Sequence, residues 1–270
     1  MPHSLRSGYL KSDTLSKRYL SRAEGVRPEL RSSVASPPNT TPAPFQISIF
    51  CYLSLSISPV ILKLVNYIFD FDGTLVDSME AFIDIFNKNV RGKNNPLTLA
   101  EIDKYRGMSS RKAIRKMGIH WWQFPKILAE GVPEYHAKLA SLKPFPNLSE
   151  VLKKLIERGD RLYIVTSNVH SSVETFIENN GLGAFFLGIE TGYGLFKKGK
   201  AIKRLMKKYD LQRRDTVYIG DETRDQRAAR QARVKIASVT WGFNDKEILT
   251  HRHPDYLLEN PRDLLKISGN

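Results

Sequence analysis

The sequence lacks the residues that a disulfide framework would need. Its 270 residues include a single cysteine, Cys51, so no internal disulfide can form, and we expect a reducing compartment. Acidic residues are also scarce relative to basic ones, with 28 Asp and Glu against 42 Lys and Arg and a formal net charge of +14. That balance suits an anionic ligand, nucleic acid or an acidic surface, and equally a solvated basic surface without a partner.

Long apolar runs are scarce as well, and the one candidate, residues 45–62, carries no charge but is a poor membrane span. Its length is at the lower limit for a transmembrane helix of about 17–25 residues. Four serines, a glutamine and Pro59 interrupt it, and the alternation of Ser with apolar residues at 53–58 has the period of a strand. We therefore expect no membrane contact here, with a membrane anchor through residues 45–62 as the alternative.

Residues 1–44 do not have the composition of a folded domain. Ser, Arg, Pro and Thr dominate, and residues 36–44 contain four prolines. We expect residues 1–62 to form a disordered or apolar extension. An organelle-targeting peptide is the alternative, which the acidic residues Asp13, Glu24 and Glu29 weaken; a cytoplasmic location is the expectation.

Beyond residue 62, strand-like and helix-like segments alternate along the chain. The expected strands lie at 65–71, 162–165, 184–189, 216–219, 236–240 and, at an edge, 256–258. The expected helices lie at 147–158, 171–179, 200–209, 225–232 and 261–266. This alternation predicts an α/β fold with a doubly wound parallel sheet.

The residues between the first two strands have a helical pattern throughout, which predicts an inserted all-helical domain at 79–141. The core domain would then consist of residues 63–78 and 142–270.

Two carboxylates follow the first expected strand. Asp70 and Asp72 stand one residue apart, Gly73 allows a sharp turn, and Asp77 or Ser78 can cap the next helix. Carboxylates this close repel each other unless a cation lies between them, and Mg²⁺ is the usual cation for such ligands.

Polar residues also stand where later strands end. Thr166, Ser167 and Asn168 follow the second strand, and residues 220–225 follow the fourth, while a lysine-rich segment at 196–200 opens a helix. The carboxyl ends of parallel strands meet at one edge of a sheet. We therefore expect acids, a hydroxyl, a lysine and helix N-termini to converge, a set that fits a phosphoryl group.

Four segments resemble the motifs of the haloacid dehalogenase superfamily, in particular its phosphoglycolate-phosphatase-like branch with a helical cap. Residues 70–75, Asp-Phe-Asp-Gly-Thr-Leu, match the first motif, and the apolar run into Thr166 matches the second. Lys198 matches the third, and Gly-Asp-x-x-x-Asp at 220–225 the fourth. The likeness extends from about Lys63 to the C-terminus.

The resemblance implies a Mg²⁺-dependent phosphatase that hydrolyses a small phosphorylated metabolite through an aspartyl-phosphate. Asp70 would be the nucleophile and Asp72 the general acid and base. The phosphoryl and substrate contacts would come from Thr166, Ser167, Asn168, Lys198 and Arg106. The metal ligands would be Asp70, the backbone carbonyl of Asp72, Asp221 and Asp225.

Several roles have alternatives. Lys197 and Lys200 compete with Lys198 for the lysine role, because the branch has Gly where Lys197 stands. Asp225 could instead cap a helix. Arg233 replaces the usual Gly after the last motif's helix, which would cost roughly 1 kcal/mol if the backbone is left-handed there.

Two other functions compete with the phosphatase. One is a phosphomutase of the same superfamily, and the other is a non-catalytic basic protein that binds a partner or is tethered to a membrane. No nucleic-acid-binding motif is present, so we expect no nucleic acid partner. We expect a monomer or a homodimer.

Overall fold

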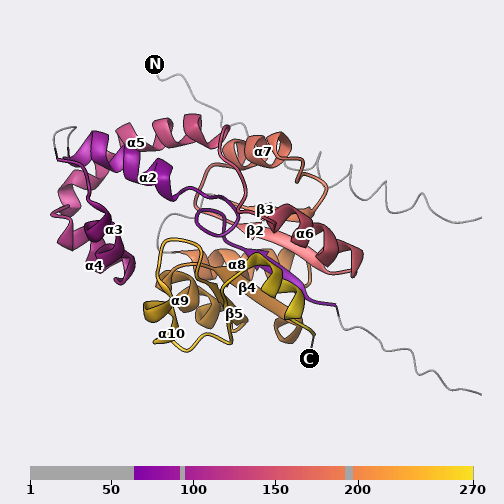
Figure 1. Ribbon diagram of the computed structural model, residues 1–270. Helices are drawn as coiled ribbons and strands as arrows, with labels where there is room; N and C mark the ends of the chain where they lie inside the picture. Colours follow the sequence, from indigo (N-terminus) through magenta and orange to yellow (C-terminus); the bar gives the residue numbers. More distant parts are fainter. Residues whose placement is uncertain (1–63, 92–94, 192–196, 270) are drawn as a thin grey trace, which may run out of the picture. The chain divides into compact units, whose positions relative to one another are not determined.

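The computed structural model describes residues 64–91, 95–191 and 197–269 (Figure 1). Six strands form one sheet in the order β3-β2-β1-β4-β5-β6, and all neighbouring strands are parallel. Their bounds are β1 Asn66–Phe69, β2 Arg161–Val165, β3 Phe186–Glu190, β4 Thr216–Gly220, β5 Lys235–Val239 and β6 Tyr256–Leu258. The doubly wound parallel sheet predicted from the sequence is confirmed, with 256–258 as an edge strand.

Helices cover both faces of the sheet because alternate strand residues are apolar on both sides. In β1, Tyr67 and Phe69 pack in one buried cluster and Ile68 in another. The first cluster lies under α6 (Leu148–Glu157) and α7 (His170–Asn179), and the second under α8 (Lys198–Lys208) and α9 (Thr223–Ala232). The chain also forms α10 (Lys246–Thr250) and short 3₁₀ helices at Arg213–Asp215 and Pro261–Lys266.

The segment between β1 and β2 is helical, as predicted (Figure 1). Its elements are α2 (Met79–Phe86), a π-helical turn (Asn87–Arg91), α3 (Leu99–Arg106), α4 (Ser110–Lys116), a 3₁₀ turn (Trp121–Gln123) and α5 (Phe124–Leu139). We refer to α2–α5 as the helical insertion.

Several local expectations differ from the structure, mostly by one or two residues at the ends of elements. β1 ends at Phe69 rather than residue 71, so Asp70 already lies beyond the strand. Ser78 occupies the N-cap position of α2, but its side chain makes no capping hydrogen bond, because its backbone is outside the extended region. The segment 261–266 is a 3₁₀ helix.

The predictions for residues 1–62 lie outside the described residues. Among the helices that the structure describes, none has the length and apolar character to cross a membrane.

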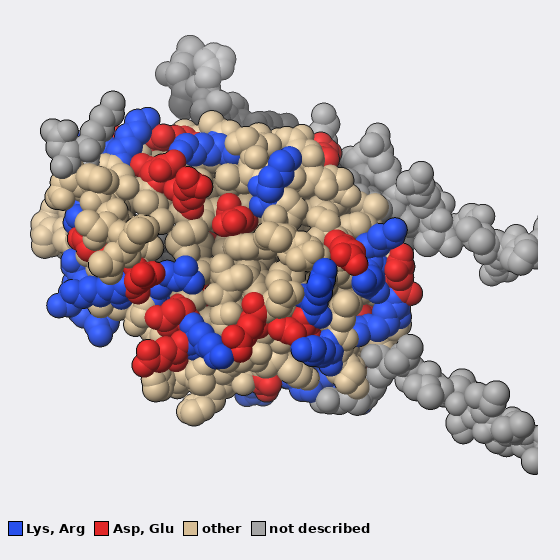
Figure 2. Space-filling model, viewed as in Figure 1, with Lys and Arg blue, Asp and Glu red and all other residues tan. Residues whose placement is uncertain are grey.

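Charged side chains of both signs are interspersed on the face shown in Figure 2. Lysines and arginines gather over α3 and α4, where α4 contributes Arg111, Lys112, Arg115 and Lys116. The positive net charge of the chain is therefore not collected into one continuous surface on this face.

Candidate active site

The turn after β1 brings two strand ends together. Gly73 has a φ of 71°, and a Cβ at this position would overlap the Asp221 carboxylate and the Phe243 ring. Thr74 Oγ1 donates to Asp221 Oδ1 at 2.8 Å, and the Asp70 N–H donates to the Ile219 carbonyl at 2.8 Å. The turn can be this tight because glycine tolerates a positive φ and has no side chain.

Three buried carboxylates lie together at this edge of the sheet. Asp70, Asp221 and Asp225 are 4%, 0% and 0% exposed, and one oxygen from each lies within 4.8 Å of the others. Asp70 and Asp221 follow β1 and β4, and Asp225 lies in the first turn of α9. The carboxyl edge of the sheet therefore collects these acids, as the strand order predicts.

Lys198 provides a positive charge inside this cluster. Its Nζ lies 2.5 Å from Asp70 Oδ2 and 2.5 Å from Asp225 Oδ1. The side chain is buried because Gly199 lets α8 approach α9 closely; a Cβ there would overlap Gln231. Lys197 and Lys200 are exposed. Among the three candidate lysines, the structure brings Lys198 to the carboxylates.

Burial sets the electrostatics of the cluster. Desolvation raises the pKa of Asp70 to about 7, against the opposing charge of Lys198. The pKa of Asp221 is raised well above its usual value by desolvation and by the negative charges of Glu222, Asp225 and Asp70.

Acidic groups outnumber basic groups around this edge. The acids are Asp70, Asp72, Asp221, Glu222 and Asp225, and the cations beside them are Lys198 and Arg224. A divalent cation with oxygen ligands would offset the excess, and clustered carboxylates are the donors that Mg²⁺ prefers. The residues present therefore fit a magnesium ion.

Asp72 points away from the acid cluster towards the helical insertion. The hydroxyl of Tyr135, on α5, donates to Asp72 Oδ1, and Asn168 Nδ2 donates to Oδ2 at 2.8 Å. Desolvation raises the pKa of Asp72, and these two hydrogen bonds oppose that increase. The carboxylate is thus oriented by one residue from the insertion and one from the loop after β2.

The loop after β2 presents the predicted hydroxyl. Thr166 is buried, its N–H donates to the Glu190 carbonyl at 3.0 Å, and its Oγ1 accepts from the Asn168 N–H at 3.1 Å. Ser167 and Asn168 line a cavity beside it.

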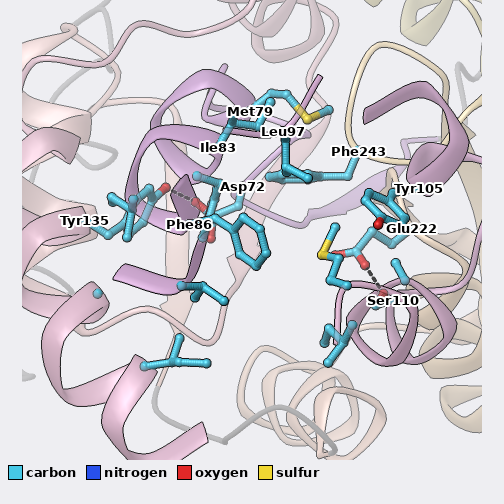
Figure 3. A pocket seen from close by; sticks show the side chains of 18 of the residues that line it. Asp72, Met79, Ile83, Phe86, Leu97, Tyr105, Ser110, Tyr135, Glu222 and Phe243 are labelled. Atoms are coloured by element: carbon cyan, nitrogen blue, oxygen red, sulfur yellow. Dashed lines mark hydrogen bonds between the residues drawn. The ribbon is translucent and has the colours of Figure 1, made fainter. Parts of the chain in front are cut away.

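That cavity has a volume of about 570 Å³ and lies between the helical insertion and the edge of the sheet. Figure 3 shows Asp72 and Tyr135 on one side of it and the hydrogen-bonded pair Ser110 and Glu222 on another. Arg106, predicted as a substrate contact, is among its lining residues.

Sequence reasoning missed two of the residues at this site. Tyr135 is 63 positions from Asp72 in the chain, and no local pattern marks it. Arg224 lies within the fourth motif between two predicted acids, so its position alone could have indicated it. Its guanidinium pairs with Glu222 at 2.6 Å. Burial would lower the pKa of Arg224, but the surrounding acids raise it above its usual value.

A comparison with known protein families agrees with the fold and with the motifs. The chain belongs to the haloacid dehalogenase-like hydrolases: a sequence model of that family matches residues 67–239. The resemblance drawn from the motifs is confirmed.

Individual proteins are also similar to most of this chain. A phosphoglycolate phosphatase of Synechococcus elongatus is 36% identical over 200 residues, which cover 74% of this chain and 94% of the relative. The pyrophosphatase PpaX of Oceanobacillus iheyensis is 26% identical over 75% of this chain and 96% of its own. A haloacid dehalogenase-like hydrolase from Streptococcus pneumoniae has the same fold, with a TM-score of 0.64 at 24% identity over 76% of this chain and 98% of that one.

Proposed function

We propose that this protein is a Mg²⁺-dependent phosphatase that hydrolyses a phosphomonoester of a small organic metabolite. The observation that carries the proposal is the buried group formed by Asp70, Asp221, Asp225 and Lys198 next to Thr166. Two relatives that cover most of this chain are named as phosphatases, one for phosphoglycolate and one for pyrophosphate.

In the first half of the reaction, a carboxylate oxygen of Asp70 attacks phosphorus. The bond from phosphorus to the ester oxygen breaks, and Asp72 gives its proton to the departing alcohol. Lys198 lies against Asp70 and favours its ionised, nucleophilic form. Thr166 and the neighbouring N–H groups bind phosphoryl oxygens.

In the second half, water hydrolyses the aspartyl-phosphate. Asp72 accepts a proton from the water as its oxygen attacks phosphorus, and the bond to the Asp70 oxygen breaks. Free phosphate leaves, and both carboxylates return to their starting states.

Asp70, the Asp72 carbonyl and Asp221 would hold Mg²⁺, with Asp225 close behind. When bound, the ion would neutralise charge on the phosphoryl oxygens.

Asp70→Asn tests the nucleophile directly. We expect phosphate release from a panel of phosphomonoesters, with Mg²⁺ present, to fall at least a thousandfold, because the amide is a far weaker nucleophile. Asp77→Asn is the matched control, since Asp77 is an exposed acid on the same loop; its turnover should stay within about twofold. Turnover retained by Asp70→Asn would overturn the assignment, and isomerisation of a sugar phosphate without phosphate release would indicate a mutase.

Chelation tests the metal. Removing divalent cations with EDTA should abolish turnover, and adding Mg²⁺ should restore it. Asp221→Asn should raise the Mg²⁺ concentration needed for half-maximal turnover at least tenfold, because a charged ligand becomes neutral. Full turnover in EDTA would contradict the proposal.

A further inference from the structure

The cavity beside Asp72 is large and apolar. Its volume of about 570 Å³ is within the range of roughly 300–1,000 Å³ of sites that bind drug-sized organic molecules. Phosphoglycolate adds only a two-carbon acid to the phosphate, which would fill a small part of it. Most of the lining is apolar, including Ile83, Phe86, Leu97, Ile102, Met108 and Ile114.

Residues from all four helices of the insertion, α2 to α5, line the cavity. Neither α3 nor α4 has a fully buried residue. Ile102 on α3, Ile114 on α4 and Met117 just after α4 are only half-buried, and all three line the cavity. Protein interiors are normally close-packed, with few voids larger than a water molecule. An apolar space of this size is therefore better explained by a ligand than by poor packing.

The polar residues of the lining lie where a phosphoryl group would enter. Asp72, Ser167 and Asn168 line the cavity and also adjoin Thr166 and Asp70. A phosphoryl group at Asp70 would thus place its ester oxygen near Asp72 and its organic group in the cavity. Three other charged residues line the cavity: Glu222, Arg224 and Arg106. Glu222 and Arg224 form an ion pair at 2.6 Å, so their charges largely cancel.

Aromatic rings close one side of this space. Phe82 stacks on Tyr135 with ring centroids 4.4 Å apart and meets Phe243 edge-on at 5.3 Å. Phe82 is nevertheless 36% exposed, and all three residues line the cavity. These rings offer an apolar surface next to the hydroxyl of Tyr135, which donates to Asp72; Figure 3 shows Tyr135 beside Asp72.

We propose that the substrate is a phosphomonoester whose alcohol carries an extended apolar group, aliphatic or aromatic, which occupies this cavity. The inference rests on the phosphatase activity proposed above and names the class of substrate for the same site.

A series of alkyl phosphates tests it. Ethyl, butyl and hexyl phosphate have alcohols of nearly equal acidity, so the chemical step changes little along the series. Each CH₂ group that becomes buried should raise kcat/KM about fourfold. We expect hexyl phosphate to exceed ethyl phosphate on the order of a hundredfold and to exceed phosphoglycolate as well.

The outcomes separate this inference from the proposed function. Phosphate release from phosphoglycolate and ethyl phosphate, without a rise along the series, would overturn the apolar substrate and leave the phosphatase intact. Release from none of these esters would overturn both.

A substitution within the cavity locates the effect. Ala113, on α4, lines the cavity, and Ala113→Phe should lower the hexyl-to-ethyl ratio of kcat/KM at least tenfold by filling the space. Lys116→Leu is the matched control, because Lys116 is exposed on the same helix and its ratio should not change. An unchanged ratio in Ala113→Phe would place the apolar group elsewhere and overturn the proposal.

A binding measurement does not depend on the folding of that variant. In Asp70→Asn with Mg²⁺ present, calorimetry should give hexyl phosphate a Kd at least tenfold below that of phosphoglycolate. Equal or weaker binding of hexyl phosphate would contradict the inference.

Discussion

The hydroxyl of Tyr135 connects the helical insertion to the chemistry. It donates to Asp72, and the ring is 4% exposed. Tyr135→Phe keeps the ring and removes one of the two hydrogen bonds that orient the carboxylate. One such bond contributes on the order of 1–1.5 kcal/mol, so we expect kcat to fall about tenfold while KM changes little. Steady-state kinetics measures the split.

Tyr105→Phe is the control for this change. Tyr105 lines the same cavity, but its hydroxyl has no hydrogen bond to Asp72, so its kcat should stay within about twofold. An equal loss in both variants would mean that cavity polarity, rather than the orientation of Asp72, limits turnover.

Arg233 is in the left-handed conformation that the missing glycine predicted. It ends α9 with a φ of 60° and a ψ of 43°, and its side chain is exposed. Arg233→Gly should therefore stabilise the protein by about 1 kcal/mol, measured by urea unfolding. Arg227→Gly makes the same change at an exposed position inside α9 and should destabilise by about 1 kcal/mol. The same sign for both would contradict the backbone argument.

Single residues were predictable from the sequence where the topology alone positions them. Asp70, Thr166 and Asp221 each follow a strand, and parallel strands bring their carboxyl ends to one edge, so their proximity needed no packing detail. Which of Lys197, Lys198 and Lys200 lies near the carboxylates depends on which side of α8 faces the core. In the structure Lys198 is buried, and Lys197 and Lys200 are exposed. Tyr135 depends on tertiary contact between distant segments and could not be predicted.

At the scale of elements, the spacing of apolar residues predicts the strands and most of the helices. Their observed ends differ from the predicted ends by a few residues. The 3₁₀ form of residues 261–266 and the π-helical turn at Asn87–Arg91 were not predicted. Both depend on the hydrogen-bond partner that each N–H selects, which the apolar pattern does not encode.

The turn after β1 is an element whose shape depends on one glycine. Gly73→Ala would add strain at a φ of 71° and would also force a Cβ against Asp221 and Phe243. We expect a loss of at least about 2 kcal/mol in unfolding free energy and a large loss of turnover, because Asp221 must move. Thermal unfolding and phosphate release measure the two effects.

Gly118→Ala separates strain from overlap. Gly118 has a similar φ of 78°, but a Cβ there would meet nothing within 4 Å. Gly118→Ala should lower the free energy of unfolding by only about 1 kcal/mol and should leave turnover unchanged. If the two variants behaved alike, the overlap at Gly73 would have no effect on the site.

At the scale of the whole molecule, the helical insertion is held to the sheet edge by polar contacts on both sides of the cavity. Tyr135 contacts Asp72 on one side. On the other, Ser110 donates to Glu222, and Asn244 Nδ2 donates to the carbonyls of Arg106 and Met108 at 2.9 Å each. Because the cavity lies between these contacts, the position of the insertion should determine how well the organic group of the substrate is enclosed.

Asn244→Ala tests that dependence. Asn244 is 4% exposed, and its Oδ1 also accepts from the Thr223 N–H at 3.0 Å. Removing the Asn244 side chain leaves two carbonyls and one N–H without this partner, which should lower the free energy of unfolding by about 2–3 kcal/mol. Hydrogen exchange should rise at Thr223 and at residues 106–109 more than in β1 or β4, and KM should rise more than kcat falls.

Asn179→Ala is the control. It removes a similar bond, from Asn179 Nδ2 to the Ala140 carbonyl at 3.0 Å, at an exposed position, and should lower the free energy of unfolding by less than about 0.5 kcal/mol. A uniform rise in exchange across the sheet would show that Asn244 stabilises the whole fold rather than the joint between insertion and core.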